Sequence, residues 1–173
     1  VIDRAALDDE EREQAQDILR VMAADAAELV RRALAVTLKS SDILPRDVAL
    51  RLAKDVESIC LPVLNFSPAF TDDDLTEIVR LGGPVRQVAI AKRPRISEKV
   101  TAAIVELGVE QAVETVCAND NATFSERTLQ SALDRFEKSE RVLAAVAYRN
   151  ALPLAVTERL IDMVGHQVRD HLL

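Results

Sequence analysis

Apolar residues recur every three to four positions along most of the chain, which is the spacing of one face of an α-helix. After Pro45, for example, they stand at Val48 and Leu52. Four later segments repeat this pattern, and every segment begins directly after an apolar residue followed by Ser, Thr or Pro. The five starting positions are Pro45, Thr71, Ser97, Ser125 and Pro153. They are separated by 26, 26, 28 and 28 residues, which indicates an internal repeat.

Each starting residue is suited to begin a helix. The hydroxyl groups of Thr71, Ser97 and Ser125 can accept hydrogen bonds from the free N–H groups of a first helical turn. Pro45 and Pro153 fit a first turn because no hydrogen bond is lost there. The pattern therefore predicts five helix starts.

A second short helix is predicted before each of the four later starts. Its apolar residues lie in the segments 60–64, 85–89, 113–117 and 142–146. Gly82, Gly83 and Gly108 are suited to end the helices that follow Thr71 and Ser97. No Asn-Gly or Asp-Gly hairpin turn flanks the short apolar runs, which disfavours strands.

A single pair of helices this short cannot bury its apolar side, but stacked pairs share one continuous core. We therefore predict an all-α fold, a HEAT-like α-solenoid in which antiparallel helix pairs form a right-handed stack, as a single domain over residues 1–173. Residues 44–173 would hold the repeats and a C-terminal capping helix from Pro153 to about His171. Residues 1–43 would form an N-terminal capping helix and loop, with one continuous amphipathic helix over about residues 9–38. The predicted apolar face of that helix is Ile18, Leu19, Met22, Ala26, Leu29, Val30 and Ala33.

Composition agrees with closely packed helices. Aromatic residues make up only 3% of the 173 residues, Trp is absent, and there are four Gly and six Pro. Cys60 and Cys117 lie in apolar runs, where free cysteine usually behaves as a small buried hydrophobe. No apolar run approaches the roughly 18 residues of a membrane span, and no signal peptide is evident. We therefore expect a cytoplasmic protein that does not enter a membrane, and the start at Val1 permits it to be a fragment of a longer protein.

Four sequence segments carry a resemblance to a known family. They are LPVLNFSPAFTDDDL, AIAKRPRIS, CANDNATFS and AYRNALPLAV. Together they resemble the repeat core of the bacterial family called domain of unknown function 2336, over about Leu44 to Leu173. The resemblance implies HEAT-like repeats in a cytoplasmic protein. It implies no particular chemistry, because the family has no assigned activity.

A polar residue stands four positions before each of the last four helix starts. These residues are Ser67, Arg93, Asn121 and Arg149. The favoured interpretation is structural, because such side chains can bond the free carbonyl groups at helix ends. The alternative is an edge that grips a carboxylate or phosphate, for which forked arginine contacts are suited.

A basic cluster near the middle of the chain supports the alternative. It comprises Arg80, Arg86, Lys92, Arg93, Arg95 and Lys99, opposed by Glu77 and Glu98. A solvated helix face is the commoner explanation for such charges, but an acidic peptide or a nucleic-acid backbone could dock there. The candidate binding residues from both patterns are Arg93, Arg95, Lys92, Arg86, Arg149, Asn121 and Ser67.

Signatures of catalysis are lacking, so we expect no enzyme activity, cofactor or metal. His166 and His171 are five residues apart, which does not place both on one helical face. The acidic run 72–74 is better explained as charge at a helix start. We expect a scaffold or regulatory module that binds another protein, with a homodimer as one form of it. Nucleic-acid binding is the alternative, which the net charge of −7 disfavours.

Overall fold

The structure is a computed structural model that describes residues 8–171 of the chain and the side chains of residues 8–164. Within these residues the chain forms eleven helices and no strand. An isolated parallel bridge joins Ile96 to Ala122. The predicted all-α class is confirmed. The chain divides into two compact units, Val1–Thr71 and Asp72–Leu173, which are described separately below. The predicted single domain stays a prediction.

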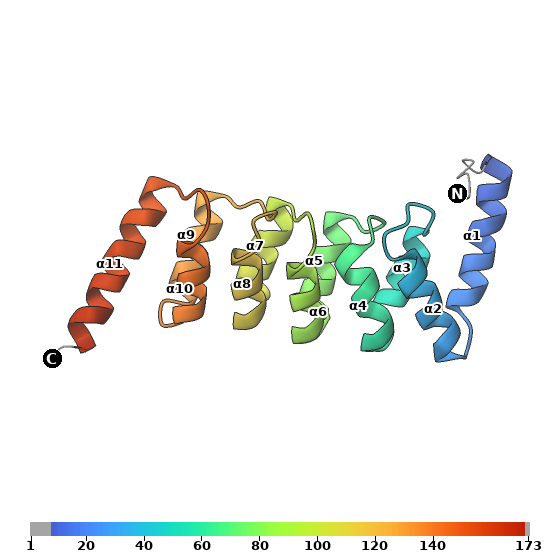
Figure 1. Cartoon of the computed structure of the whole chain (residues 1–173), viewed down its shortest axis with the longest axis horizontal. Coiled ribbons are helices and arrows are strands. Elements are labelled where there is room, and N and C mark those ends of the chain that lie inside the picture. The colour runs from blue at the N-terminus through green and yellow to red at the C-terminus, as the bar shows by residue number, and fades with distance from the viewer. Residues whose placement is uncertain (1–7, 172–173) are drawn as a thin grey trace, which may run out of the picture. The chain divides into compact units, whose positions relative to one another are not determined.

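The helices follow the predicted repeat (Figure 1). The first unit contains α1 (Asp9–Ala23), α2 (Glu28–Leu38), α3 (Arg46–Ala53) and α4 (Glu57–Phe66). The second unit contains α5 (Asp72–Leu81), α6 (Gly83–Ala91), α7 (Glu98–Leu107), α8 (Glu110–Cys117), α9 (Glu126–Arg135), α10 (Glu140–Ala147) and α11 (Leu154–His171). All five predicted starts are confirmed, because α3, α5, α7, α9 and α11 each begin at the residue after the predicted position.

Local chemistry accounts for several of these boundaries. The Ser97 hydroxyl oxygen accepts a hydrogen bond from the Val100 N–H, and Ser125 caps α9 in the same way. The predicted end of α5 is confirmed at the Gly82-Gly83 pair, where Gly83 has a φ of 74° that favours glycine. At Gly108, a side-chain Cβ would lie 2.4 Å from a backbone oxygen, so only glycine fits the end of α7.

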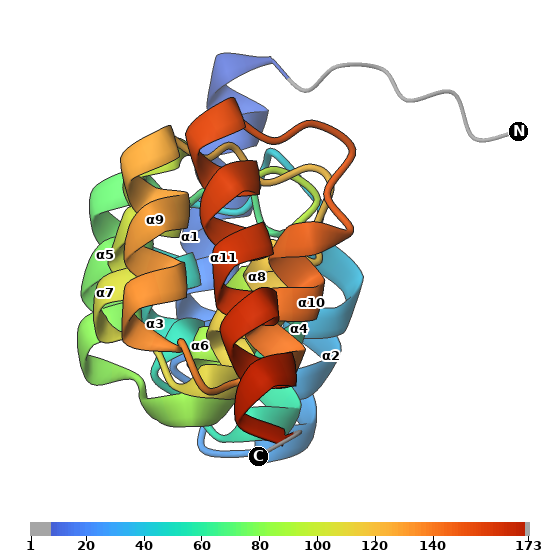
Figure 2. The same cartoon turned by 90° about the vertical axis from the view of Figure 1, so that its left-hand side faces the viewer.

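The helices of the second unit pack in two rows. In one row α5, α7, α9 and α11 contact each other in turn, and in the other α6, α8 and α10 do so. Each of α5, α7 and α9 also packs against the helix that follows it. Figure 2 shows the two rows side by side, with α11 in front of both. Every short helix inside the unit therefore contacts neighbours in its own row and in the other row.

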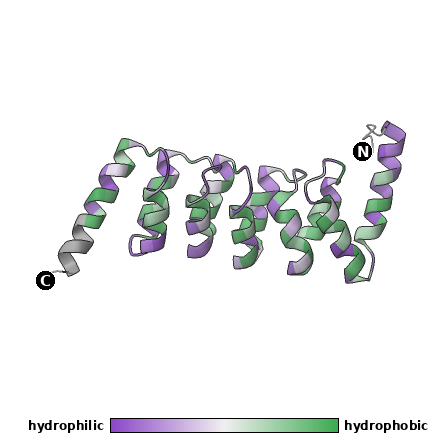
Figure 3. Ribbon diagram, in the orientation of Figure 1, coloured by the Kyte–Doolittle hydropathy of each residue, from purple (hydrophilic) through white to green (hydrophobic). Residues whose placement is uncertain are grey.

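The core of the second unit runs between the rows. Val79 and Leu133 from one row and Ile90, Val116 and Val146 from the other are fully buried. Hydrophilic residues gather at the turns that begin α8 and α10 (Figure 3). Burial of apolar surface in the middle of each helix therefore holds the unit together.

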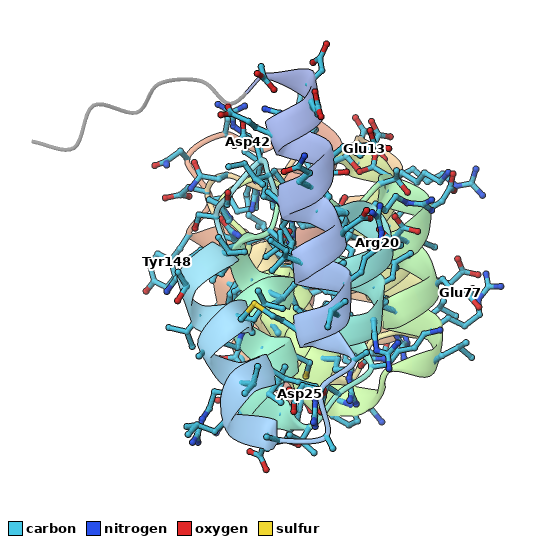
Figure 4. The ribbon with its side chains drawn as sticks, turned by 90° about the vertical axis from the view of Figure 1, so that its right-hand side faces the viewer. Glu13, Arg20, Asp25, Asp42, Glu77 and Tyr148 are labelled. Atoms are coloured by element: carbon cyan, nitrogen blue, oxygen red, sulfur yellow. The ribbon has the colours of Figure 1, made fainter. Side chains whose placement is uncertain are left out.

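The first unit departs from the prediction at its N-terminal helix. The expected continuous helix over about residues 9–38 is wrong, because α1 ends at Ala23 and α2 begins at Glu28. The Asp25 side chain accepts a hydrogen bond from the Ala27 N–H, and the Arg31 guanidinium donates to the backbone oxygens of Asp25 and Ala26. These bonds stabilise a turn at residues 24–27, and Figure 4 shows Asp25 at this connection.

The turn also changes which residues of this segment are buried. Ile18 and Leu29 belong to the predicted apolar face, but they are 61% and 67% exposed. The buried residues of the two helices are Ala23, Leu34 and Ala35. The prediction failed because a single helical period was applied across a break in the helix.

Ion pairs join elements of the first unit within its described residues. The Arg31 guanidinium is bonded to the Asp55 carboxylate, with an Nε to Oδ2 distance of 2.6 Å, and both side chains are largely buried. The Arg20 Nε lies 2.9 Å from Oδ2 of Asp47 at an exposed site. Only the Arg31–Asp55 pair is sheltered enough from solvent to matter for stability. Among the described residues, no helix combines the length and the hydropathy needed to cross a membrane.

We expect Asp55→Asn to lower the thermal unfolding midpoint of the chain at neutral pH. The hydrogen bond from Arg31 lowers the pKa of Asp55 from its usual value of 3.8. A carboxyl group with a lowered folded-state pKa stabilises the fold above its unfolded pKa, and this contribution is lost as the pH falls through the folded value. Circular dichroism melts should therefore show the gap between wild type and variant closing below pH 3.8.

Asp42→Asn is the matched control, because Asp42 is an exposed aspartate of the same unit (Figure 4). It should leave the midpoint almost unchanged at neutral pH. A gap for Asp55→Asn that persists undiminished at low pH would show that the ion pair is not its source.

Candidate functional site

The predicted polar row contains one side chain that bridges successive repeats. Arg149 lies just after α10, and its guanidinium donates hydrogen bonds to the backbone oxygens of Cys117, Asn119 and Ala122, at 2.8, 3.2 and 2.9 Å. The same group lies 4.5 Å from the ring centre of Phe124. Arg149 therefore satisfies the carbonyl groups at the end of α8 and in its following loop, which is the structural role that the sequence favoured.

Asn119 performs the equivalent task one repeat earlier, although the sequence pointed to Asn121. The Asn119 Nδ2 donates to the backbone oxygens of Ala91 and Arg93, at 3.0 and 2.9 Å. Asn121 is exposed, and its backbone N–H donates to Asn119 Oδ1.

The difference comes from loop length. The loop 118–125 is two residues longer than the loops 92–97 and 148–153, so a count backwards from the next helix start slips by two positions. Counted forwards, Arg93, Asn119 and Arg149 each stand two residues after the last residue of their helix. Counting from the helix ends would have identified Asn119 from the sequence.

The other two members of the predicted row are buried. Ser67 is fully buried, and its hydroxyl accepts a hydrogen bond from the Ala69 N–H. Arg93 is only 8% exposed, and its burial lowers the pKa of the guanidinium, an effect that the charge of Asp72 opposes. By contrast, Tyr148 beside Arg149 is 87% exposed and points away from the surface (Figure 4). The row therefore does not form an exposed edge of arginine side chains.

The predicted basic cluster is divided between the two ends of α6. Arg80 and Arg86 lie beside the turn between α5 and α6, while Lys92 and Arg95 lie in the loop after α6. Arg86 stands six residues before Lys92, a rise of about 9 Å along the helix axis, and its guanidinium reaches back to Gly82 at the start of α6. The cluster is not a single patch.

Several members of the cluster also have partners within the chain. The Arg86 guanidinium donates to the Gly82 backbone oxygen. The Lys99 ammonium forms an ion pair of 2.5 Å with Asp73. Lys92 and Arg95 are exposed, and they are the members best placed to meet a ligand.

The two cysteine thiols lie in the core of the described part of the chain, away from solvent. Cys60 and Cys117 are fully buried thiols outside any disulfide, and their burial agrees with the prediction. Burial raises the pKa of the Cys117 thiol to about 12, although Arg149 opposes the shift, so this thiol stays protonated at neutral pH. The described residues contain no cluster of three or more His, Cys, Asp or Glu side chains that could hold a metal ion. His166 and His171 lie outside the described side chains.

The most distinctive surface feature of the second unit is an apolar groove between α10 and α11. Its volume is about 690 Å³, and leucine, isoleucine, valine and alanine side chains supply most of its lining. We call this the α10–α11 groove. Its lining residues are Glu140, Leu143, Ala144, Ala147, Leu152, Thr157, Leu160, Ile161 and Val164. The groove was not predicted from the sequence, because the helix from Pro153 was expected to be a cap.

The groove lies where the repeat pattern would place another helix. Val79, Val105 and Leu133 stand eight residues after their respective helix starts, and their exposures are 0%, 2% and 0%. In each case the second helix of the pair packs against the helix that carries the residue. Ile161 stands at the same position in α11 and is 66% exposed, and no second helix is paired with α11 among the described residues.

The row of α6, α8 and α10 also has an uncovered residue beside the groove, at the end of α10. Ala91 and Cys117 are the last residues of α6 and α8, and both are fully buried. Ala147 is the last residue of α10 and is exposed. The groove therefore combines two surfaces that are covered everywhere else in the unit.

A second hollow lies between α7 and α9 and differs in chemistry. Its volume is about 670 Å³, and its lining mixes carboxylates such as Glu98 and Asp134 with the guanidinium groups of Arg127 and Arg135. Arg135 also donates to the Val105 backbone oxygen. Charges of both signs give no clear ligand preference, so the α10–α11 groove is the stronger candidate site.

Comparison with known proteins identifies the family of the chain. The family model described as "Uncharacterised protein conserved in bacteria (DUF2336)" matches residues 59–173. The chain belongs to the DUF2336 family. The matched range contains every helix from α5 to α11 and therefore the whole α10–α11 groove. No curated protein matches the chain, and neither does any solved structure.

We expect Arg149→Leu to destabilise this DUF2336 chain by about 2 kcal/mol, because three carbonyl groups would lose a charged donor. Chemical denaturation monitored by circular dichroism measures the change. Arg149→Lys should restore little of the loss, because an ammonium group cannot reproduce the fork of a guanidinium. Arg141→Ala changes an exposed arginine of α10 and should cost less than about 0.5 kcal/mol. Equal effects of the Arg149 and Arg141 changes would contradict the bridging role.

Proposed function

We propose that this protein is a non-catalytic, HEAT-like solenoid that binds other proteins, and that the α10–α11 groove is its binding site. The observation that carries the proposal is the exposure of Ile161, at a position that is covered in every preceding pair. Large apolar patches on a protein surface commonly mark interaction sites. The proposed setting is the bacterial cytoplasm, in line with the sequence expectation.

The shape of the groove favours a helix as its ligand. In each preceding pair of the unit, a short helix packs against the helix that carries the position equivalent to Ile161. The groove offers a partner the same apolar side chains that these helices bury. Recognition would then follow the familiar mode in which the apolar face of an amphipathic helix lies in a hydrophobic groove.

The character of the lining supports binding over catalysis. Glu140 is the one charged residue among those that line the groove, and Thr157 adds a hydroxyl group. A single carboxylate without a paired acid, base or nucleophile is a poor basis for a reaction. Apolar burial would supply most of the affinity, and Glu140 at the edge would orient a partner through its charge.

Site-specific crosslinking tests this proposal. A photoreactive amino acid at Ile161 should form a covalent adduct with a protein in living bacteria, because the groove would hold a partner helix within reach. Leu81 is the matched control, since it is 73% exposed in the same unit but lies on α5, away from the groove. Adducts of equal yield at both positions, or at neither, would refute a specific site at the groove.

Nucleic-acid binding is a second candidate, because Lys92 and Arg95 are exposed in one loop. The net charge of −7 weighs against it. If the loop binds a phosphate backbone, the Lys92→Glu, Arg95→Glu double variant should abolish a gel shift seen with wild type at low salt, where phosphate contacts are strongest. Absence of any shift with wild-type protein at micromolar concentration would exclude this function.

A further inference from the structure

We infer that the hollow between α7 and α9 is a second docking groove, which binds a helix of a partner protein that carries acidic side chains along one side and basic side chains along the other. This α7–α9 groove shares no lining residue with the α10–α11 groove, so the two sites can be tested separately. α7 and α9 are neighbours in one row of the second unit (Figure 2). Three features of the groove select its occupant: the order of its charges, their spacing, and the small side chains between them.

The charges of the α7–α9 groove are sorted by wall. The wall that α7 supplies carries Glu98 and Glu106. The wall that α9 supplies carries Arg127 and Arg135. A simple anion or cation meets attraction at one wall and repulsion at the other, so it gains little. A ligand that turns basic groups to α7 and acidic groups to α9 is attracted by both walls.

Ion pairs join the neighbouring helices of this row on both sides of the groove. The Lys99 ammonium of α7 pairs with Asp73 of α5, and the Arg159 guanidinium of α11 pairs with Asp134 of α9. Asp134 also lines the groove, but Arg159 offsets its charge. The α9 wall therefore stays basic.

The spacing of the charges matches a helix. The two glutamates of α7 stand eight residues apart, and so do the two arginines of α9. At 1.5 Å per residue, the charges of each wall are about 12 Å apart along the groove. A helix lying in the groove has the same rise, so its side chains seven or eight residues apart reach both charges of a wall. An extended peptide turns alternate side chains away from each wall and matches this spacing poorly.

Small side chains stand between the charges on both walls. Ala102 lies midway between the two glutamates of α7, and Ser131 lies midway between the two arginines of α9. Val105 and Thr128 lie at the bottom of the groove, with exposures of 2% and 7%. The distance between packed helices depends on the side chains at their contact, so these small residues let a third helix approach closely.

Arg135 is held in position before a ligand binds. Its guanidinium donates a hydrogen bond of 2.7 Å to the Val105 backbone oxygen and lies 4.8 Å from the ring centre of Phe136. A guanidinium has five N–H donors, so the bond to Val105 leaves others for a carboxylate. A side chain that is already fixed loses less entropy on binding. Arg135 is therefore the expected anchor for an acidic residue of the partner.

Crosslinking with identification of the captured segment tests this assignment. A photoreactive amino acid at Ser131 should join a partner protein in living bacteria, because the side chain lies inside the groove. Mass spectrometry of the joined peptide locates the captured segment. On a helical projection, that segment should show one line of acidic and one line of basic residues, each with a spacing of seven or eight residues.

Charge reversal tests whether the walls hold the partner. The Arg127→Glu, Arg135→Glu double variant should lower the adduct yield at least about tenfold, because attraction at the α9 wall becomes repulsion. The Arg80→Glu, Arg141→Glu double variant is the matched control. It makes the same change in net charge at two exposed arginines of the unit that do not line the groove, and it should leave the yield unchanged. Circular dichroism shows whether both variants fold.

A charge exchange tests the contact directly. A synthetic peptide with the sequence of the captured segment should bind the wild-type chain in fluorescence anisotropy titrations, and the binding should weaken at high salt, which screens exposed charges. Replacing the acidic residues of the peptide by Lys should abolish this binding. The same peptide should bind the Arg127→Glu, Arg135→Glu variant, a rescue that a purely structural role of the two arginines would not produce.

Four results would overturn the second groove. They are the absence of an adduct at Ser131, an adduct that survives the reversal of both arginines, a captured segment without the two lines of charge, and failure of the exchanged peptide to bind the reversed variant. If any of these occurs while Ile161 still forms its adduct, only the α7–α9 groove is refuted and the proposed function stands.

Discussion

Short helices cannot be stable alone, and this constraint governs the second unit. A helix of eight to ten residues has too few hydrogen bonds to offset the cost of its first turn in water. Each such helix must therefore bury an apolar face, and the rows supply that burial on several sides at once. Ile90 and Val116 are fully buried for this reason. The constraint also applies at the last helix of the unit, where α11 contacts α9 and α10 among the described residues.

Short helices raise a second problem, because a large share of their carbonyl groups lies at helix ends. Arg149 and Asn119 solve it by donating from one repeat to the backbone of the preceding one. Gln87 makes a related connection, since its amide donates to the Val79 oxygen and accepts from the Val109 N–H. These bonds fix the spacing of neighbouring pairs, whereas the apolar contacts supply most of the free energy.

The sequence predicted the parts of the fold that depend on local chemistry. Helix starts depend on a cap and on the apolar period after it, so α7 and α9 could be placed from Ser97 and Ser125 alone. The break between α1 and α2 could not be placed in this way. It depends on Arg31, whose guanidinium reaches back to the turn and also to Asp55, and such distant contacts leave no periodic signal.

The candidate site was harder to predict than the fold, because it depends on which side chains are buried when the helices pack. Sequence patterns favoured Arg93 and Arg95 because clustered charge is visible along the chain, but burial of Arg93 appears only when the helices pack. The α10–α11 groove is the reverse case, because residues such as Ile161 look buried in the sequence but are exposed in the structure. Ile161 looks like any core residue in the sequence, because its position is a core position in every preceding repeat. Its exposure appears only in the packed structure, where it is 66%.

The same reasoning explains why the α10–α11 groove is a more plausible functional surface than the basic loop. Lys92 and Arg95 remain hydrated whether or not a ligand is present, so leaving them unbound costs little free energy. Leu154, Ile161 and Val164 expose apolar surface to water until something covers them. The net negative charge of the chain opposes nonspecific association through charge repulsion. It does not remove these three apolar side chains from contact with water. A partner that buried these three side chains would gain free energy, because their apolar surface would leave water.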